Sequence, residues 1–177
     1  MKVAPVLVLA TLLLAGSAQA AGPRTVQQKM VAIALKEARR NVQEVPTHSN
    51  TGPDIRRYHT AVKHARTTEP WCAIFVSYVA KKAGYPLGSV SQGIWDIKNL
   101  FKWGRHEGFY FNKGARKVKV GDIAVHGYGH SGIVVRVTKS GAIYTVDANW
   151  SDTVRYQPIP YLSVSGYIRL PSRPRGA

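Results

Sequence analysis

Hydrophobic residues recur at helical spacing near the start of the chain. The positions that repeat three or four residues apart are Val31, Leu35, Ala38 and Val42. This spacing predicts an amphipathic helix that ends at about Gln43. Thr25, followed three residues later by Gln28, is typical of a capping box, so we expect the helix to begin there.

Three further helices are predicted before about Phe109. Pro53 suits the first turn of a short helix. The segment from Trp71 to Gly84 is apolar on nearly all sides, which indicates a buried central helix with glycine at its C-terminal end. A partly amphipathic fourth helix is expected in "SQGIWDIKNLFKWGRHEG", with Ser91 as its N-cap.

After about Phe109 the pattern changes to short runs rich in Val, Ile and Tyr. These runs are "VGDIAVHG", "HSGIVVRVTKSG", "AIYTVDANW" and "VSGYIRL". They predict strands, and Ser140-Gly141 suits a hairpin turn between two of them. Helices followed by strands in one small unit indicate an α+β fold with an antiparallel sheet. We expect a single domain over residues 21–170 and a disordered tail over 171–177.

The first twenty residues have the features of a secretory signal peptide. Lys2 precedes an apolar run, and Ala18-Gln19-Ala20 matches a signal peptidase site. The apolar run is short for a membrane span, although an uncleaved anchor is the alternative interpretation. We therefore expect an exported, periplasmic or extracellular protein without a membrane span.

The chain is strongly basic. It contains 25 Lys and Arg residues against 9 Asp and Glu, a formal charge of +16. The cations are spread along the chain, which indicates a basic surface that could meet nucleic acid, an anionic membrane or an acidic wall polymer. Export disfavours nucleic acid as a partner. The alternative interpretation is that the positive charge only keeps the protein soluble.

Cys72 is the only cysteine, so it cannot form an internal disulfide. It falls in the first turn of the predicted central helix. Unpaired backbone N–H groups and the positive end of the helix dipole stabilise a thiolate at such a position. A reactive thiol is one interpretation, and a buried structural cysteine is the other.

A nucleophilic cysteine needs a base and a group that orients the base. Among six histidines, His130 begins an apolar strand and has nearby glycines that permit close approach. Asp147 and Asn149 are two residues apart on the next strand, so both can face the same side of the sheet. Pairing of the two strands would bring that side to the imidazole. The alternative is that Asp147 and Asn149 form a turn that ends the strand.

A metal site is a weaker hypothesis. Asp122, His126 and His130 are spaced four residues apart, as metal ligands on one helix face would be. The glycines between them argue against a helix, and we expect neither a metal nor another cofactor.

Three stretches together resemble the CHAP family, the cysteine- and histidine-dependent amidohydrolases/peptidases. They are "PWCAIFVSYVAKKAG", "VGDIAVHGYGHSGIVVRV" and "YTVDANWSD", and the resemblance covers about residues 41 to 169. It implies a papain-like fold related to NlpC-type cell-wall peptidases, with Cys72 as nucleophile and His130 as general base. The family commonly has Glu-x-Asn where this chain has Asp147-Ala148-Asn149. We take Asp147 as the group that orients His130 and Asn149 as an assisting residue.

For an exported protein, the resemblance implies hydrolysis of an amide bond in peptidoglycan, as an amidase or as a stem or cross-bridge endopeptidase. We expect a monomer whose partner is peptidoglycan, with an inhibitor or immunity protein as a further partner. Two alternatives remain open at this point. One is a non-catalytic basic protein that binds the cell wall or membrane, and the other is a deamidase or transpeptidase toxin.

Overall fold

A computed structural model describes residues 24–89, 92–127, 129–159 and 163–176. These residues form an α+β fold, as the sequence predicted. The helices are α1 (Val26–Arg39), α2 (Pro53–His59), α3 (Cys72–Lys82) and α4 (Ile97–His106). The strands are β1 (Tyr110–Asn112), β2 (Ile123–His126), β3 (His130–Val137), β4 (Ile143–Trp150), β5 (Thr153–Pro158) and β6 (Val164–Ile168). The expected signal peptide, residues 1–20, lies outside the described residues.

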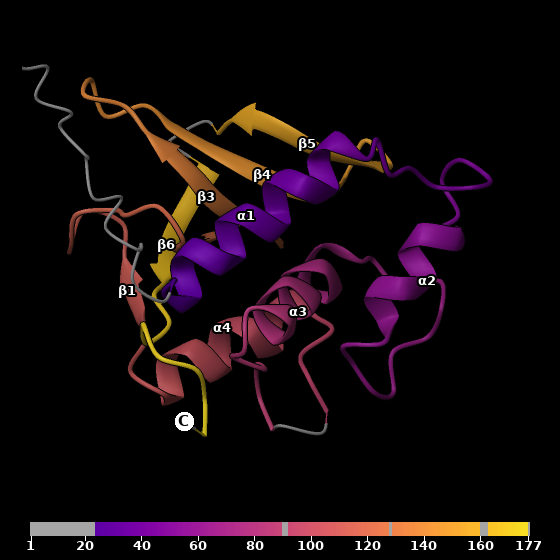
Figure 1. The fold of residues 1–177 in the computed structure, drawn as a ribbon, viewed down its shortest axis with the longest axis horizontal. Helices are drawn as coiled ribbons and strands as arrows, with labels where there is room; N and C mark the ends of the chain where they lie inside the picture. The colour runs from indigo at the N-terminus through magenta and orange to yellow at the C-terminus, as the bar shows by residue number, and fades with distance from the viewer. Residues whose placement is uncertain (1–23, 90–91, 128, 160–162, 177) are drawn as a thin grey trace, which may run out of the picture.

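The strands form one antiparallel sheet in the order β1-β6-β2-β3-β4-β5. The β3–β4 hairpin turns at the predicted Ser140-Gly141 site, where Thr138 N donates to Ala142 O at 2.9 Å. Gly141 has a φ of 87°, which glycine adopts without strain. Helix α1 lies across the front of β3 and β4, and α3 and α4 lie beneath it (Figure 1).

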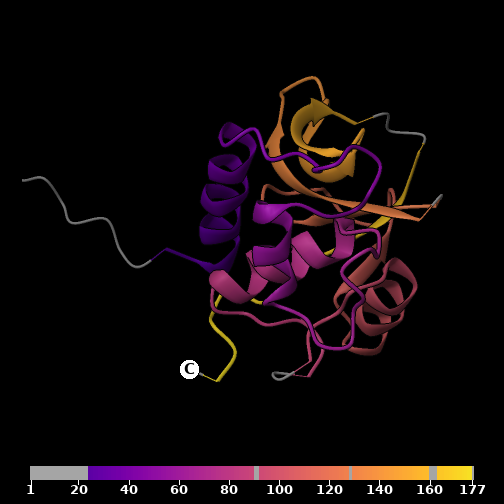
Figure 2. The same cartoon turned by 90° about the vertical axis from the view of Figure 1, so that its right-hand side faces the viewer.

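Helix α3 is the centre of the core. Every residue from Cys72 to Ala80 is buried, as the nearly all-apolar pattern predicted. The helix packs against α1, α2 and α4 and against strands β3 and β4. In the turned view, α1 stands to the left of the sheet, while α2 and α3 lie below it (Figure 2). A smaller apolar cluster includes Phe111, Val134 and Tyr167. The larger core thus holds the start of α3 against the sheet.

The ends of two helices differ from the prediction. Helix α1 begins with the expected Thr25–Gln28 capping box but ends at Arg39 rather than near Gln43. Asn41 adopts a φ of 53°, which breaks the helical path. Helix α4 is capped by Asp96, whose side chain accepts from Asn99 N at 2.8 Å. Ser91, the expected cap, lies outside the described residues, and residues 92–95 are not helical.

The structure of three segments in the second half of the chain differs from the prediction. Strands β1 and β5 had no sequence signal of their own and pair with β6 and β4. The C-terminal segment, which we expected to be disordered, is exposed but makes hydrogen bonds to the rest of the chain at Ser172 and Arg175. Ser172 O accepts from Val26 N at 2.9 Å, and Arg175 Nη1 donates to Gly88 O at 2.6 Å.

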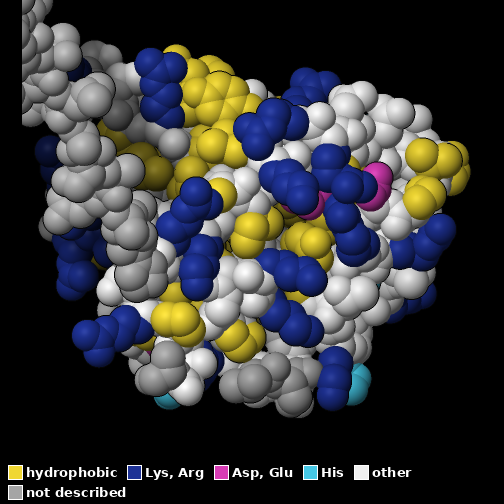
Figure 3. Space-filling view, in the orientation of Figure 1, with side chains coloured by type: hydrophobic (Ala, Val, Ile, Leu, Met, Phe, Trp, Pro, Cys, Tyr) yellow, Lys and Arg dark blue, Asp and Glu magenta, His cyan; other side chains and the backbone are white. Residues whose placement is uncertain are grey.

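On the face of the molecule that contains α1, basic side chains outnumber acidic ones (Figure 3). Lys and Arg side chains are spread over the whole face that contains α1, and few Asp or Glu side chains appear among them (Figure 3). This arrangement agrees with the absence of a dense basic block in the sequence. Among the described residues, none of the helices has both the length and the apolar character needed to cross a bilayer.

Candidate active site

Cys72 is the first residue of α3, so its backbone N–H lies in the first turn of the helix. The N-cap residue, Trp71, makes no side-chain capping hydrogen bond. The Cys72 side chain is buried, with 4% of the residue exposed, but it lines a cavity of about 300 Å³. Trp95, Lys98 and Gly129 line the same cavity. A substrate can therefore reach the sulfur from this side.

His130 lies between Cys72 and Asp147. Its Nε2 is 3.1 Å from Asp147 Oδ1, and its ring is hydrogen-bonded to the Cys72 side chain. Because Nε2 faces the carboxylate, Nδ1 is the nitrogen that faces the sulfur. The structure thus brings together three of the four residues that the sequence suggested, in one hydrogen-bonded row.

Strand pairing explains why Asp147 meets the imidazole. Residue Gly132 of β3 pairs with Asp147 of β4, and His130 lies two residues before Gly132 on the same face. A Cβ atom at Gly132 would lie 2.1 Å from Asp147 Oδ1. Glycine at this position therefore leaves the space in which the carboxylate reaches His130.

Two residues that the sequence analysis did not single out hold the carboxylate. Asp147 Oδ2 accepts from the Thr145 hydroxyl and from Gln157 Nε2, the latter at 3.2 Å. Asp147 is fully buried. With these donors on one oxygen, the other oxygen is directed at His130. The alternation of Thr145 with Asp147 along β4 is the only sequence signal that could have indicated this support.

The charge state of His130 follows from its neighbours. Burial of the ring favours the neutral form, but the hydrogen bonds to Asp147 and Cys72 and the negative charges of both oppose it. Together they raise the pKa of His130 to about 9. The imidazole is therefore protonated at neutral pH, and it faces a carboxylate on one side and the sulfur on the other.

Two rings pack against His130. The edge of Trp150 meets the imidazole at a centroid distance of 5.2 Å, and His126 lies at 5.5 Å. Burial and the charge of His130 lower the pKa of His126 to about 4, so His126 is neutral at neutral pH. Its Nδ1 lies 3.0 Å from Ser163 Oγ. His126 therefore adds no second positive charge beside His130.

Asn149 does not share the position that we expected for it. A register shift between Ala148 and Trp150 and a φ of 59° at Asn149 break the alternation of side chains along β4. The amide lies 3.0 Å from the Asn50 side chain. With its nitrogen turned toward Glu44, it donates to Oε1 at 3.1 Å and accepts from Trp71 N at 3.1 Å.

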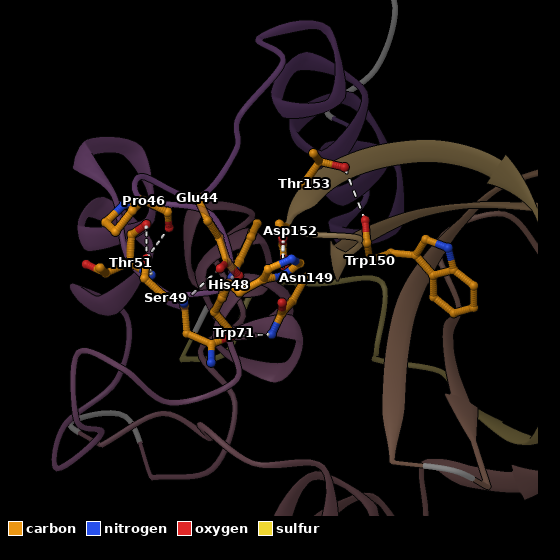
Figure 4. A network of polar contacts seen from close by, with 11 residues as sticks. Glu44, Pro46, His48, Ser49, Thr51, Trp71, Asn149, Trp150, Asp152 and Thr153 are labelled. Carbon is orange, nitrogen blue, oxygen red and sulfur yellow. Dashed lines mark hydrogen bonds and ion pairs between the residues drawn. The ribbon is translucent and has the colours of Figure 1, made fainter.

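Asn149 belongs to a buried network centred on Glu44 (Figure 4). Glu44 accepts from Trp71 Nε1 at 2.9 Å and from Asn50 N at 2.8 Å. Trp71 is fully buried and stacks on Tyr58, so it is a packing residue rather than a surface for substrate. Trp150 points away from this network, toward the His130 side of the strand (Figure 4).

The network fixes the residue that precedes Cys72, and the sequence analysis missed its central member. Glu44 is 5% exposed, in a chain with only nine acidic residues. A lone carboxylate between Val42 and Val45 was the available signal, because a buried charge requires partners.

The residues considered for a metal have other contacts. Both carboxylate oxygens of Asp122 accept from Arg169, at 2.7 Å each. The described part of the chain contains no group of three or more His, Cys, Asp or Glu residues that could hold a metal ion.

A sulfur, a protonated imidazole and a buried carboxylate in a row can perform acyl transfer. The sulfur can attack an electrophilic carbon, and the imidazole can donate a proton to the group that leaves.

A family model described as CHAP domain matches residues 64–149. The matched segment begins before α3 and ends at Asn149, so it contains Cys72, His130 and Asp147. No curated protein and no solved structure matches the chain.

Proposed function

Since residues 64–149 form a CHAP domain, which implies hydrolase chemistry of the amidase or peptidase kind, we propose that this protein is an exported thiol hydrolase of peptidoglycan. It cleaves an amide bond, either between muramic acid and L-alanine or within the stem or cross-bridge peptides. The observation that carries the proposal is the hydrogen-bonded row of Cys72, His130 and Asp147 beside an accessible cavity.

The proposed reaction begins with attack of the Cys72 thiolate on the amide carbonyl. The backbone N–H of Cys72 stabilises the oxyanion, because it points out of the first turn of α3. The His130 imidazolium gives its proton to the leaving amine, which leaves a thioester on Cys72. A water molecule then loses a proton to His130 and attacks the thioester, which releases the acid and restores the thiolate–imidazolium pair. Asp147 keeps the ring oriented throughout.

The substrate class follows from two features. The leader predicted at residues 1–20 carries the protein to the compartment that contains the wall. The basic surface favours a polymer with many carboxylates, and peptidoglycan is such a polymer.

The test is the loss of turbidity of purified cell walls with the wild type, Cys72→Ala, His130→Ala and His48→Ala. His48 is an exposed histidine of the loop between α1 and α2 and serves as the matched control. We expect the two site variants to lose activity by about 10³-fold or more and the control to keep it. Equal clearing by all four proteins would remove the catalytic assignment.

The basic surface also supports a second candidate, a non-catalytic protein that binds the wall through its charge. Alkylation of Cys72 with iodoacetamide separates the two. A hydrolase loses its effect on walls when the thiol is blocked, whereas a charge-based binder keeps its affinity for them.

A further inference from the structure

A second cavity adjoins the one that contains Cys72. It has a volume of about 430 Å³, and its lining includes Lys63, Trp95, Lys102 and Trp103, which together we call the tryptophan pocket. Trp95 and Asp96 line both cavities, so the tryptophan pocket begins where the Cys72 cavity ends. Its volume falls in the range of small-molecule sites, about 300–1,000 Å³.

Three segments of the chain form the tryptophan pocket, and a backbone hydrogen bond joins two of them. Lys63 lies in the loop between α2 and α3, Trp95 precedes α4, and Trp103 lies on α4. Lys63 N donates to Gln92 O at 2.7 Å, which joins the two loops. The Trp103 ring meets Phe109 edge-on at a centroid distance of 5.7 Å. Both indoles are half-buried, so they form a wall rather than loose surface groups.

The charge of the pocket favours an anion. Lys63 and Lys102 are exposed basic side chains of its lining. Asp96 is the only carboxylate among the described lining residues, and it already accepts from the backbone and the side chain of Asn99 as the cap of α4. An ammonium group and a ligand carboxylate form a charge-assisted hydrogen bond.

The two indoles favour a ring that presents C–H groups. Flat aromatic faces pack against the apolar face of a sugar ring, and their size gives a large contact area at a small cost in entropy. The Nε1 of Trp103 is buried and has no hydrogen-bond partner among the described residues. A buried donor without a partner is unfavourable, and a turn of the indole that exposes Nε1 would let it donate to an acceptor such as an acetamido oxygen.

We propose that the tryptophan pocket binds an N-acylated amino sugar that has a carboxylate on its attached peptide, immediately beside the bond that Cys72 attacks. The sugar ring packs on Trp95 and Trp103, and the carboxylate pairs with Lys63 and Lys102. The proposal rests on the proposed function, of which it names a substrate-binding site. In this proposal, α4 and the loop before it bind the glycan.

The experiment measures binding rather than cleavage, in a Cys72→Ala protein that cannot form the thioester. The probes are a purified disaccharide-peptide from peptidoglycan and the neutral oligomer chitotetraose, both titrated by calorimetry. Trp95→Ala should weaken both by about tenfold or more. Lys63→Gln with Lys102→Gln should weaken only the disaccharide-peptide, by about three- to tenfold, because chitotetraose has no carboxylate.

A matched control removes two exposed lysines elsewhere, Lys36→Gln on α1 and Lys117→Gln before β2. It lowers the net charge equally and should leave both affinities unchanged. Unaltered binding in the Trp95 and the double-lysine variants would overturn the proposal, as would failure of the Cys72→Ala protein to bind either probe. Wall clearing by the wild type is measured separately. The binding results can therefore contradict the proposed role of the tryptophan pocket without contradicting the proposed hydrolase activity, and the clearing results can do the opposite.

Discussion

At the scale of single residues, the candidate site depends on how a short carboxylate reaches an imidazole. Asp147 spans the distance because Gly132, opposite it, has no side chain, and because Thr145 and Gln157 hold its second oxygen. The carboxylate both orients His130 and raises the pKa of the ring against the effect of burial. Orientation and charge state are thus set by the same contact.

Asp147→Asn separates these two effects. The amide can still bond to the ring, but it removes the negative charge, so the pKa of His130 falls from about 9. Activity that needs the imidazolium is lost as pH rises through the pKa of His130, so the alkaline limit of kcat/KM moves to lower pH. We also expect kcat to fall by about 10²- to 10⁴-fold. The pH–rate profile of wall hydrolysis measures both.

The control for that profile is Asp152→Asn, a carboxylate in the turn after β4 that does not contact His130. It should keep the alkaline limit of the wild type. An unchanged profile in Asp147→Asn would mean that another group holds the proton on the ring.

At the scale of elements, the side chains at the end of β4 contact two different parts of the site. Trp150 packs on His130, whereas Asn149 joins Glu44 and the backbone of Trp71. The register shift between Ala148 and Trp150 makes this division possible. The strand therefore contacts both sides of the Cys72–His130 pair, the base directly and the nucleophile through the residue before it.

Glu44→Gln tests the network that holds the start of α3. Glutamine has one acceptor oxygen where the carboxylate has two, so either Trp71 Nε1 or Asn50 N loses its acceptor. A buried donor left without a partner costs about 1–3 kcal/mol, and we expect the free energy of unfolding in urea to fall by that amount. Alkylation of Cys72 by iodoacetamide should also change in rate, since Trp71 precedes it. Glu107→Gln at the end of α4 is the control, and equal stability of both variants would contradict the role of Glu44.

The elements that could be predicted from the sequence are those whose signal is local. Each of these signals is contained in a few neighbouring residues: the nearly all-apolar run of α3, the Thr25–Gln28 box, and the alternation along β3 and β4. Strands β1 and β5, the role of Glu44 and the position of Asn149 depend on contacts between distant segments. For Asn149, the assumption of strict alternation failed at a bulge, which a pattern of residue types does not reveal.

At the scale of the whole molecule, the site acts through short-range contacts, whereas the surface charge acts over longer distances. The side chains of the hydrogen-bonded row are buried, so salt screens the interactions between them little. Lysines and arginines are spread over the face that contains α1, where they would attract the proposed anionic polymer before it reaches the cavity (Figure 3). The two contributions should therefore separate when ionic strength is changed.

The last prediction uses that separation. The screening length falls from about 10 Å at 0.1 M salt to about 3 Å at 1 M, so attraction between the +16 chain and an anionic wall weakens steeply over this interval. We expect wall hydrolysis at limiting substrate to fall by about tenfold or more over the same interval. Alkylation of Cys72 by the neutral reagent iodoacetamide should change by less than about twofold, because it needs no attraction at long range. Parallel assays in both salts measure the two rates. Wall hydrolysis that stays constant would show that the basic surface does not steer the substrate, and a matching fall in alkylation would place the salt effect at the thiol itself.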